Sequence, residues 1–298
     1  MKGTFTMKII DIHCHPDWGG YNYKKITANM DEYNIAKAWI LPWQAPEDEY
    51  EPASNVAHVA LGPEGPVPFA NALKFYEKDP DRFILGFAPD PRRNESIDLL
   101  KSYMSLYDIK VYGELKLRMM YDNPDAVRMF RYCGEVGLPV LVHIDYPIDY
   151  PVQQNRRYPR PDFWFGGGIE AFARTIRQCP ETNFIGHAPG FWAHMSNDDR
   201  HMTEYYPDGP VIPGGRIHEL LDELPNMWCD LAGPSGRNAL ERDPAHGREF
   251  LLKYQDRLLY GRDTFDNLLQ DFLYSLDLPE SVLEKLFYKN AERILSGL

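Results

Sequence analysis

Eight short apolar runs recur along the chain, and most are separated by segments whose apolar residues repeat at helical spacing. The runs are Ile9–His13, Ala36–Leu41, Phe83–Ala88, Val111–Leu117, Pro139–Ile144, Asn183–Gly186, Met227–Leu231 and Leu258–Gly261. The amphipathic segments include Ile97–Leu106, Pro124–Val136, Ile169–Arg177, Ile217–Leu224 and Glu249–Tyr254. Strand and helix in regular alternation are typical of a (β/α)8 TIM barrel, which we predict as one domain over residues 1–298. An open doubly wound sheet is the alternative, but no Gly-rich phosphate loop follows an early strand.

Three further segments extend this pattern. Apolar residues at helical spacing between Pro279 and Leu295 predict an extra C-terminal helix packed on the barrel. The connections Asp145–Gly168 and Ala188–Gly215, after strands five and six, are too long for plain turns and are rich in Pro, Tyr, Trp and Arg. Because long connections in compact domains tend to be functional, we expect lids that build a pocket. The alternative is that they form the contact of a homodimer.

Composition narrows the classes of partner. The formal charge is -12, and the chain contains no block of Lys or Arg, which argues against a nucleic-acid groove or an anionic membrane surface. Four cysteines are scattered without zinc-finger spacing, and no apolar run approaches the roughly 20 residues needed to cross a bilayer. We therefore expect a reduced cytoplasmic protein whose partner is a small-molecule substrate, with no nucleic acid and no membrane.

Two histidines, His13 and His15, close the first apolar run. Residues two apart on a strand point to the same side, so both imidazoles are expected to face one way. Strict alternation places Asp11 with them and puts Ile10, Ile12 and Cys14 on the other face. In isolation such a pair is as often held by backbone hydrogen bonds in a core, so a metal site requires further ligands downstream.

Other strand tips supply residues of the required types. In barrel enzymes the reactive groups lie at the C-terminal ends of the strands. The tips here carry His13 and His15, Glu114, His143, His187 and Asp263 on strands one, four, five, six and eight. Three neutral imidazoles and one carboxylate suit zinc, with iron, manganese or cobalt feasible, and we expect one or two ions per chain. An open coordination position would hold a water whose pKa falls to roughly 7.

Individual roles follow from these positions. Asp263 can touch the metal and accept the proton of the water, and His187 leads into a long connection that faces a substrate, as suits a general base or an electrophile. Glu114 shares a predicted strand face with Lys116 and Arg118. It is either a further metal ligand or the partner of Lys116 in a buried ion pair near the metal. A carboxylated Lys116 that bridges two metals is a third option.

These motifs make the chain resemble the metal-dependent amidohydrolase superfamily, in the amidohydrolase-related branch that includes aminocarboxymuconate semialdehyde decarboxylase. The resemblance covers nearly the whole chain. Its motifs are Asp11-Ile12-His13-Cys14-His15-Pro16, Val142-His143, Ile185-Gly186-His187, Tyr260-Gly261-Arg262-Asp263 and Lys289-Asn290-Ala291-Glu292-Arg293-Ile294. It implies that His13, His15, His143 and Asp263 bind the metal and that His187 acts in acid/base chemistry or substrate polarisation. Glu114 is less general in this branch, so the metal count stays open.

The substrate side is indicated by cations and aromatic residues beyond the strand tips. Arg92, Arg118 and Arg237, with Arg156 or Arg157, suggest a substrate that bears a carboxylate, which arginine binds through two parallel hydrogen bonds. Trp18, Trp43, Trp164, Phe191 and Trp192 are candidate walls for a cyclic substrate.

Three functions remain open on these residues. Metal-dependent hydrolysis of an ester, lactone or amide needs little beyond the ligand set and is favoured. Nonoxidative decarboxylation of a cyclic or unsaturated acid is the main alternative, because the resemblance implies it. A barrel that binds metal and a partner without turnover is the third.

Overall fold

Eight parallel strands form the centre of the protein. The computed structural model describes residues 7–46, 49, 65–145 and 164–297. The strands pair in sequence order, and they are β1 Ile9–Cys14, β2 Ile35–Ile40, β3 Phe83–Gly86, β4 Ile109–Leu115, β5 Val140–His143, β6 Phe184–His187, β7 Met227–Asp230 and β8 Leu258–Leu259. Tyr260, just after β8, accepts a hydrogen bond from Ile12 in β1 at 3.0 Å, so the last and first strands also meet. The predicted TIM barrel is confirmed.

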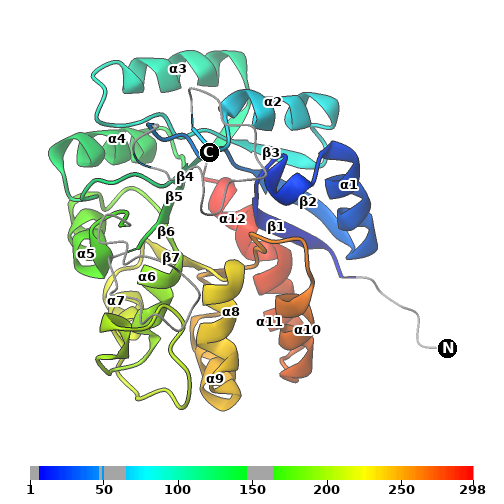
Figure 1. Ribbon diagram of the computed structural model, residues 1–298, viewed down its shortest axis with the longest axis vertical. Coiled ribbons are helices and arrows are strands. Elements are labelled where there is room, and N and C mark those ends of the chain that lie inside the picture. Colours follow the sequence, from blue (N-terminus) through cyan, green and yellow to red (C-terminus); the bar gives the residue numbers. More distant parts are fainter. Residues whose placement is uncertain (1–6, 47–48, 50–64, 146–163, 298) are drawn as a thin grey trace, which may run out of the picture.

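The helices follow in chain order, most of them around the strands and α12 at the centre of the view (Figure 1). They are α1 Tyr23–Glu32, α2 Phe69–Lys78, α3 Ser96–Leu106, α4 Pro124–Glu135, α5 Gly168–Gln178, α6 Pro189–Trp192, α7 Arg216–Glu223, α8 Gly233–Glu241, α9 Pro244–Tyr254, α10 Leu268–Ser275, α11 Glu280–Glu284 and α12 Asn290–Leu295. Local chemistry explains several starts. Asn123 caps α4 by accepting from the Asp125 N–H, and Asp243 caps α9 by accepting from the His246 N–H; in both helices a proline follows the cap.

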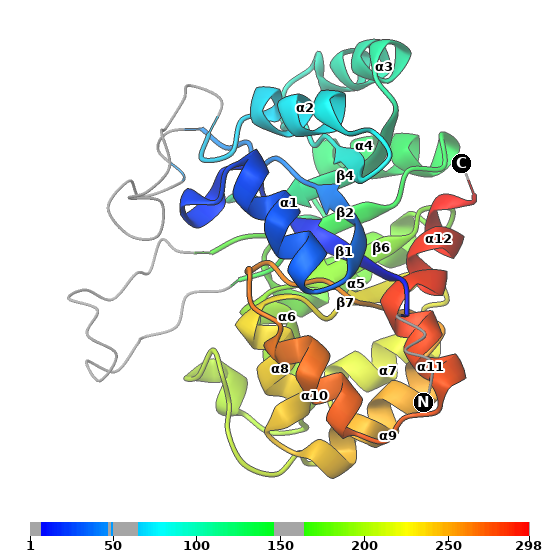
Figure 2. The ribbon, with the colours of Figure 1, turned by 90° about the vertical axis from the view of Figure 1, so that its right-hand side faces the viewer.

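The predicted C-terminal helix is present and closes one end of the barrel. A single π-turn, Lys285–Lys289, separates α11 from α12. Ala291 and Ile294 of α12 join a buried cluster with inward-facing strand residues that include Ile10, Leu141 and Leu259. Figure 2 shows α12 at the end where the strands begin. The opposite end, where the strands finish, is therefore the end left for reactive groups.

Strand β1 departs from the predicted alternation. Ile10 and Ile12 belong to the cluster inside the barrel, whereas Cys14, expected on the same face, belongs to the other core cluster, and Asp11 does not share a face with His13. Its carboxylate accepts from Arg262 Nε at 2.8 Å, while Oδ1 accepts the His13 backbone N–H at 3.1 Å. The pairing with β2 shifts register between Asp11 and Cys14. This irregularity turns His13 toward the centre, so the placement of Asp11 beside the histidines was wrong.

The connection after β6 is more ordered and more deeply packed than a plain lid. It contains α6 and two further turns, Ala193–Met195 and Arg200–Met202. Phe191, Trp192 and Met195 are buried in the main hydrophobic core. Most of the connection after β5, residues 146–163, lies outside the described residues, so the lid expected there is not tested. No helix in the described part of the chain is long and apolar enough to cross a membrane.

Candidate metal centre

Four donor atoms from three strand ends converge at the C-terminal end of the barrel. His13 Nε2 and His15 Nε2 lie 3.2 Å apart. Glu114 Oε2 lies 3.8 Å from His13 Nε2 and 3.3 Å from His15 Nε2. Asp263 Oδ1 lies 3.8 Å and 3.6 Å from the same two nitrogens. The structure thus brings His13, His15 and Asp263 together as one group of potential ligands, and it places Glu114 in a second group with His13 and His187.

These separations fit a metal ion. Zinc binds histidine nitrogen and carboxylate oxygen at about 2.0–2.2 Å, and in a tetrahedral site such bonds put neighbouring donors roughly 3.3–3.5 Å apart. The five donor–donor distances given above run from 3.2 to 3.8 Å. Two neutral imidazoles and two carboxylates also balance the charge of one divalent cation. The donor set therefore suits the metal that the sequence predicts.

Hydrogen bonds behind the two histidines fix which ring nitrogen faces the centre. His15 Nδ1 lies 2.8 Å from the backbone oxygen of Leu41, which can only accept, so Nδ1 carries the hydrogen. His13 Nδ1 lies 2.7 Å from Asp230 Oδ2 and is the donor by the same argument. In the neutral ring Nε2 of each histidine then presents a lone pair to the centre. Such outer hydrogen bonds orient metal-binding histidines in proteins generally.

The two carboxylates are held in the charged form that a cation requires. Burial alone would raise the pKa of Glu114, but the nearby imidazoles of His13 and His143 outweigh it and lower that pKa well below its usual range. Burial likewise opposes ionisation of Asp263, and the charges of the surrounding histidines lower its pKa. The side chain of Asp263 is 26% exposed, whereas those of His13, His15 and Glu114 are at most 5% exposed. Asp263 is therefore the member of the set that a substrate can approach.

His187, at the end of β6, stands between two carboxylates. Its Nε2 lies 3.5 Å from Asp263 Oδ2, and its Nδ1 lies 3.1 Å from Asp230 Oδ2, off the ideal hydrogen-bond direction. Burial and the neighbouring His13 lower the pKa of His187, but Asp230 and Asp263 outweigh them and raise it to about 9. The arrangement lets His187 exchange a proton with the outer oxygen of Asp263. A ring nitrogen of His187 also lies within 4.8 Å of donor atoms of His13 and Glu114, so these three residues form a second group that could hold a metal ion.

His143 occupies a different position from the other predicted ligands. Both of its ring nitrogens face carboxylates, with Nδ1 2.8 Å from Glu114 Oε1 and Nε2 2.7 Å from Asp145 Oδ2. Glu114 therefore directs one oxygen to His13 and His15 and the other to His143. Direct binding of a metal by His143 stays a prediction, because here its contacts support Glu114.

An aromatic wall adjoins the centre. The ring centroids of His15 and Trp18 lie 5.8 Å apart, those of Trp18 and Trp43 6.3 Å, and those of Trp43 and Phe165 6.5 Å. The ammonium of Lys116 lies 4.2 Å from the Trp43 ring centroid and 5.2 Å from that of Phe165. An ion pair of Lys116 with Glu114, one of the options that the sequence left open, is not found among the described residues, where Lys116 makes cation–π contacts with this wall instead.

Several other residues predicted to contact the substrate are paired with acids or buried in the core. Arg92 is engaged by the carboxylates of Asp90 and Glu49, and the backbone N–H of Arg118 donates to Glu49 at 2.8 Å. Trp192 is 2% exposed and its indole N–H donates to the backbone oxygen of Asp230 at 2.9 Å, so it supports the end of β7 from within the core. Phe191 is likewise buried. Arg156 and Arg157 lie outside the described residues.

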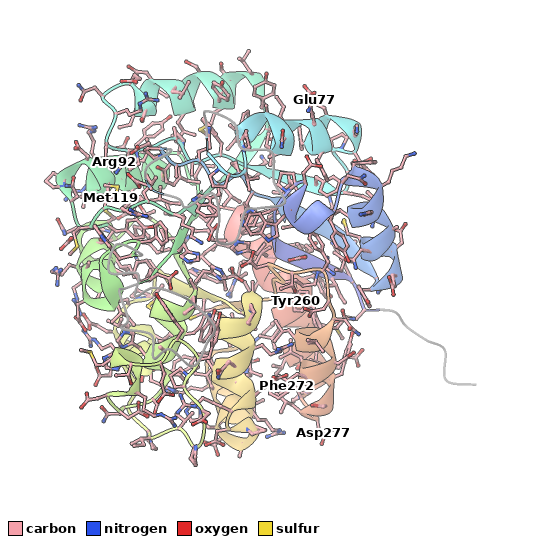
Figure 3. All side chains as sticks on the ribbon, in the orientation of Figure 1. Glu77, Arg92, Met119, Tyr260, Phe272 and Asp277 are labelled. Atoms are coloured by element: carbon pink, nitrogen blue, oxygen red, sulfur yellow. The ribbon has the colours of Figure 1, made fainter. Side chains whose placement is uncertain are left out.

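Figure 3 shows side chains filling the space inside the ring of helices, with Arg92 labelled near α4 at the left of the view. Two acids in this interior were not predicted as functional residues from the sequence. Asp230 ends β7 and contacts both His13 and His187, while Asp145 follows β5 and contacts His143. Both acids lie at strand tips, as the predicted metal ligands do. The signal was therefore present in the sequence for both acids.

The family of the chain can now be stated. A family model described as amidohydrolase matches residues 10–296, nearly the whole chain. The protein belongs to this amidohydrolase family and is an enzyme of that family. Comparison with curated proteins finds no match.

Several solved structures share the fold over almost their whole length. An amidohydrolase from Burkholderia multivorans with bound zinc is 12% identical, with a TM-score of 0.58 and coverage of 97% of this chain and 99% of that chain. A probable 2-pyrone-4,6-dicarboxylic acid hydrolase from Acinetobacter baumannii with bound citric acid is 12% identical, with a TM-score of 0.57 and coverage of 97% and 100%. A dihydroxybenzoic acid decarboxylase from Polaromonas with manganese and 2-nitroresorcinol is 13% identical, with a TM-score of 0.55 and coverage of 97% and 96%. At these identities the likeness concerns the fold.

Proposed function

We propose that the protein is a metal-dependent hydrolase that cleaves an ester, lactone or amide of a small substrate bearing a carboxylate. The observation that carries this proposal is that the two carboxylate oxygens of Asp263 face different groups. One oxygen faces the nitrogens of His13 and His15, and the other lies 3.5 Å from His187. A carboxylate placed in this way can take a proton at the metal centre and pass it to a second acid/base group.

The residues present account for the proton movements of hydrolysis. His13, His15, Glu114 and Asp263 would hold a zinc ion, which would supply Lewis-acid activation of water and of the substrate carbonyl. Asp263 accepts a proton from the attacking water as the new carbon–oxygen bond forms. His187 donates a proton to the leaving oxygen or nitrogen as the old bond breaks, and is reprotonated through Asp263 Oδ2. The carboxylate of Asp230, 3.1 Å from Nδ1 of His187, stabilises the protonated form of that ring through its charge.

Nonoxidative decarboxylation is the second candidate, and the aromatic wall favours it. Trp18, Trp43 and Phe165 present flat rings next to His15 and His143, a surface that suits a planar acid. In this reaction the bond to the carboxyl carbon breaks, carbon dioxide leaves, and a proton from His187 or Asp263 takes its place on the substrate carbon. Among the similar structures both a hydrolase and a decarboxylase occur.

The origin of the oxygen in the product separates the two reactions. Zinc-loaded protein should be incubated in ¹⁸O-labelled water with lactones and esters of carboxylic acids and, separately, with hydroxybenzoic acids. Hydrolysis places one labelled oxygen in the acid product, which mass spectrometry detects. Decarboxylation releases carbon dioxide and leaves the aromatic product without label.

The Asp263→Asn variant is the matched control, because it keeps the size of the side chain but cannot accept the proton. Label incorporation by the parent enzyme and its loss in this variant would support hydrolysis through Asp263. Release of carbon dioxide, with no label in the aromatic product, would support the second candidate instead. Turnover of neither class of compound would contradict both.

A further inference from the structure

The metal centre lies across the junction between the last and the first strands of the barrel. His13 belongs to β1, and Asp263 lies just after β8. In the described part of the chain, no strand ladder joins β8 back to β1. The backbone hydrogen bonds found across this junction run from Ile12 to Tyr260 and from Asp263 to His13, both at 3.0 Å. The separation of two predicted ligands therefore depends on few backbone contacts.

A buried ion pair between Asp11 and Arg262 spans the same junction. Oδ1 of Asp11 accepts the backbone N–H groups of His13 at 3.1 Å and of Arg262 at 2.9 Å. Oδ2 of Asp11 accepts from Arg262 Nε at 2.8 Å. The side chains of Arg262 and Asp11 are 1% and 0% exposed. Asp11 thus ties the backbone of one predicted ligand, His13, to the residue that precedes another, Asp263.

Asn29 of α1 anchors the same segment from outside the barrel strands. Its Oδ1 accepts from Arg262 Nη1 at 2.7 Å, and its Nδ2 donates to the backbone oxygen of Phe265 at 2.8 Å. The ring of Phe265 is stacked on that of Tyr21, with centroids 3.9 Å apart. Asn29 is itself buried. It therefore holds the chain on both sides of Asp263, at Arg262 and at Phe265.

Asp263 is the ligand that most requires a fixed backbone. Its φ of +51° lies in the left-handed region, which residues with a side chain adopt rarely and which persists where the surrounding structure determines it. Its side chain is 26% exposed, whereas that of His13 is fully buried. Its Oδ1 faces His13 and His15, and its Oδ2 faces His187. A change in the backbone at Asp263 would move both oxygens at once.

Stability alone does not account for an ion pair at this junction. A buried ion pair is often no more stabilising than well-packed apolar residues of the same volume, because both charges lose their hydration. Geometry offers a better reason, since a guanidinium donates hydrogen bonds in fixed directions and so determines where its partners lie. Two nitrogens of the Arg262 guanidinium connect Asp11 of β1 with Asn29 of α1.

We propose that Arg262, Asp11 and Asn29 are positioning residues, which hold Asp263 and His13 at the separation that a metal ion requires. None of the three belongs to a group of potential metal ligands among the described residues. They act through the backbone at His13 and on either side of Asp263. The inference rests on the metal centre of the proposed function and adds the residues that determine its geometry.

A double variant tests the ion pair. Removal of one partner leaves a buried charge unpaired and strongly destabilises the fold, whereas Asp11→Asn/Arg262→Met removes both charges and keeps side chains of similar size. This variant should fold but bind zinc about tenfold or more less tightly than the parent, as measured by competition with a chromophoric chelator. Its cobalt-loaded form should also differ from the parent in visible absorption, which depends on the number and arrangement of the ligands.

A second ion pair supplies the matched control, and Asn29 supplies an independent variant. Arg242, at the end of α8, lies 3.9 Å from Asp198, with side chains 3% and 14% exposed. Arg242→Met/Asp198→Asn removes a comparable pair of charges and should leave zinc affinity and cobalt absorption as in the parent. Asn29→Leu removes the acceptor of Arg262 Nη1 and should weaken zinc binding. Asn29→Asp keeps this acceptor and should retain more of the affinity.

Three outcomes would overturn the proposal. They are parent-like zinc affinity and cobalt absorption in the folded double variant, the same changes in the control pair, and equal zinc affinity in Asn29→Leu and the parent. Thermal unfolding checks that each variant is folded, and should the double variant not fold, the two Asn29 variants decide the question. The test uses no substrate, so it can succeed where no hydrolysis is observed and fail where hydrolysis is observed.

Discussion

The carboxylate of Asp230, at the end of β7, lies 2.7 Å from Nδ1 of His13, at the end of β1. This contact joins the strand before last to the first strand across the end of the barrel. It determines that His13 presents Nε2 to the metal centre, and the same Asp230 oxygen lies 3.1 Å from His187. One buried acid thus positions both a predicted ligand and the predicted proton donor.

Replacement of Asp230 by Asn should weaken zinc binding about 10–100-fold, the usual effect of removing the acid that orients a ligand histidine. The amide keeps the volume of the side chain but lacks the charge that holds His13 in one tautomer. Competition with a chromophoric chelator measures the change in affinity. Asp222→Asn, at a surface acid paired with Lys253, is the control and should leave zinc affinity unchanged. Equal affinity in the parent and Asp230→Asn would show that this contact does not orient the ligand.

His13 and His187 should differ in what they control. His13→Ala removes one of four converging donors, so both zinc content and activity should be lost. His187→Ala should retain zinc and lose turnover, because its Nε2 faces Asp263 Oδ2 rather than the centre of the donor set. Elemental analysis and activity measured on the same samples distinguish the two variants. Loss of zinc in His187→Ala would make His187 a ligand, which its proximity to His13 and Glu114 also permits.

The barrel could be predicted because alternation and spacing depend on many residues at once. All eight strands lie within three residues of the predicted ends, since each apolar run must be buried between two neighbours whatever the details of its tip. Helices α1, α2, α6, α8 and α10 were not identified individually. In α1, for example, only Ile26, Asn29 and Met30 are buried, too few apolar positions for a clear pattern.

The site was predictable in its residue types and less so in its geometry. His13, His15, Glu114 and Asp263 converge as their strand tips suggest. The side on which Asp11 lies depends on a register shift within β1, and a period-two pattern cannot show such a shift. Asp145 and Asp230 were not predicted, because each supports a histidine through a contact between strands that are far apart in sequence or at the start of a loop, and no local pattern marks such a contact.

The positions of the two Glu114 oxygens lead to a prediction of how many metal ions the protein binds. One oxygen faces His13 and His15, and the other lies 2.8 Å from His143. If the first oxygen belongs to a single metal site and the contact with His143 only supports Glu114, elemental analysis after removal of loosely bound ions should give about one zinc per chain. Glu114→Gln should then bind zinc less tightly. About two zinc ions per chain, falling to one in Glu114→Gln, would instead make this carboxylate a bridge.

Acid should destabilise the fold through two histidines remote from the metal centre. Burial, together with a neighbouring histidine, lowers the pKa of His194 and of His218 to about 4 each, against roughly 6.5 in an unfolded chain. Between these values the unfolded chain binds more protons than the folded protein, so the free energy of unfolding should fall as the pH drops from about 6.5 to 4.

Urea unfolding at a series of pH values on metal-free protein measures this slope. His218→Phe should flatten it, because the ring still packs on Phe250 but no longer takes a proton. A slope unchanged in this variant would mean that His218 does not contribute.

The helix that closes the barrel should contribute to stability and not to chemistry. Ile294 of α12 is 3% exposed and lies in the cluster inside the strands, so Ile294→Ala leaves a cavity there. The expected loss is about 2–5 kcal/mol in the free energy of unfolding, which urea denaturation measures. Leu106→Ala, at a residue 71% exposed, should change it by less than about 0.5 kcal/mol. Since the donors lie at the opposite end of the strands, folded Ile294→Ala should bind zinc as the parent does; a loss of zinc affinity in the folded variant would show that α12 also shapes the centre.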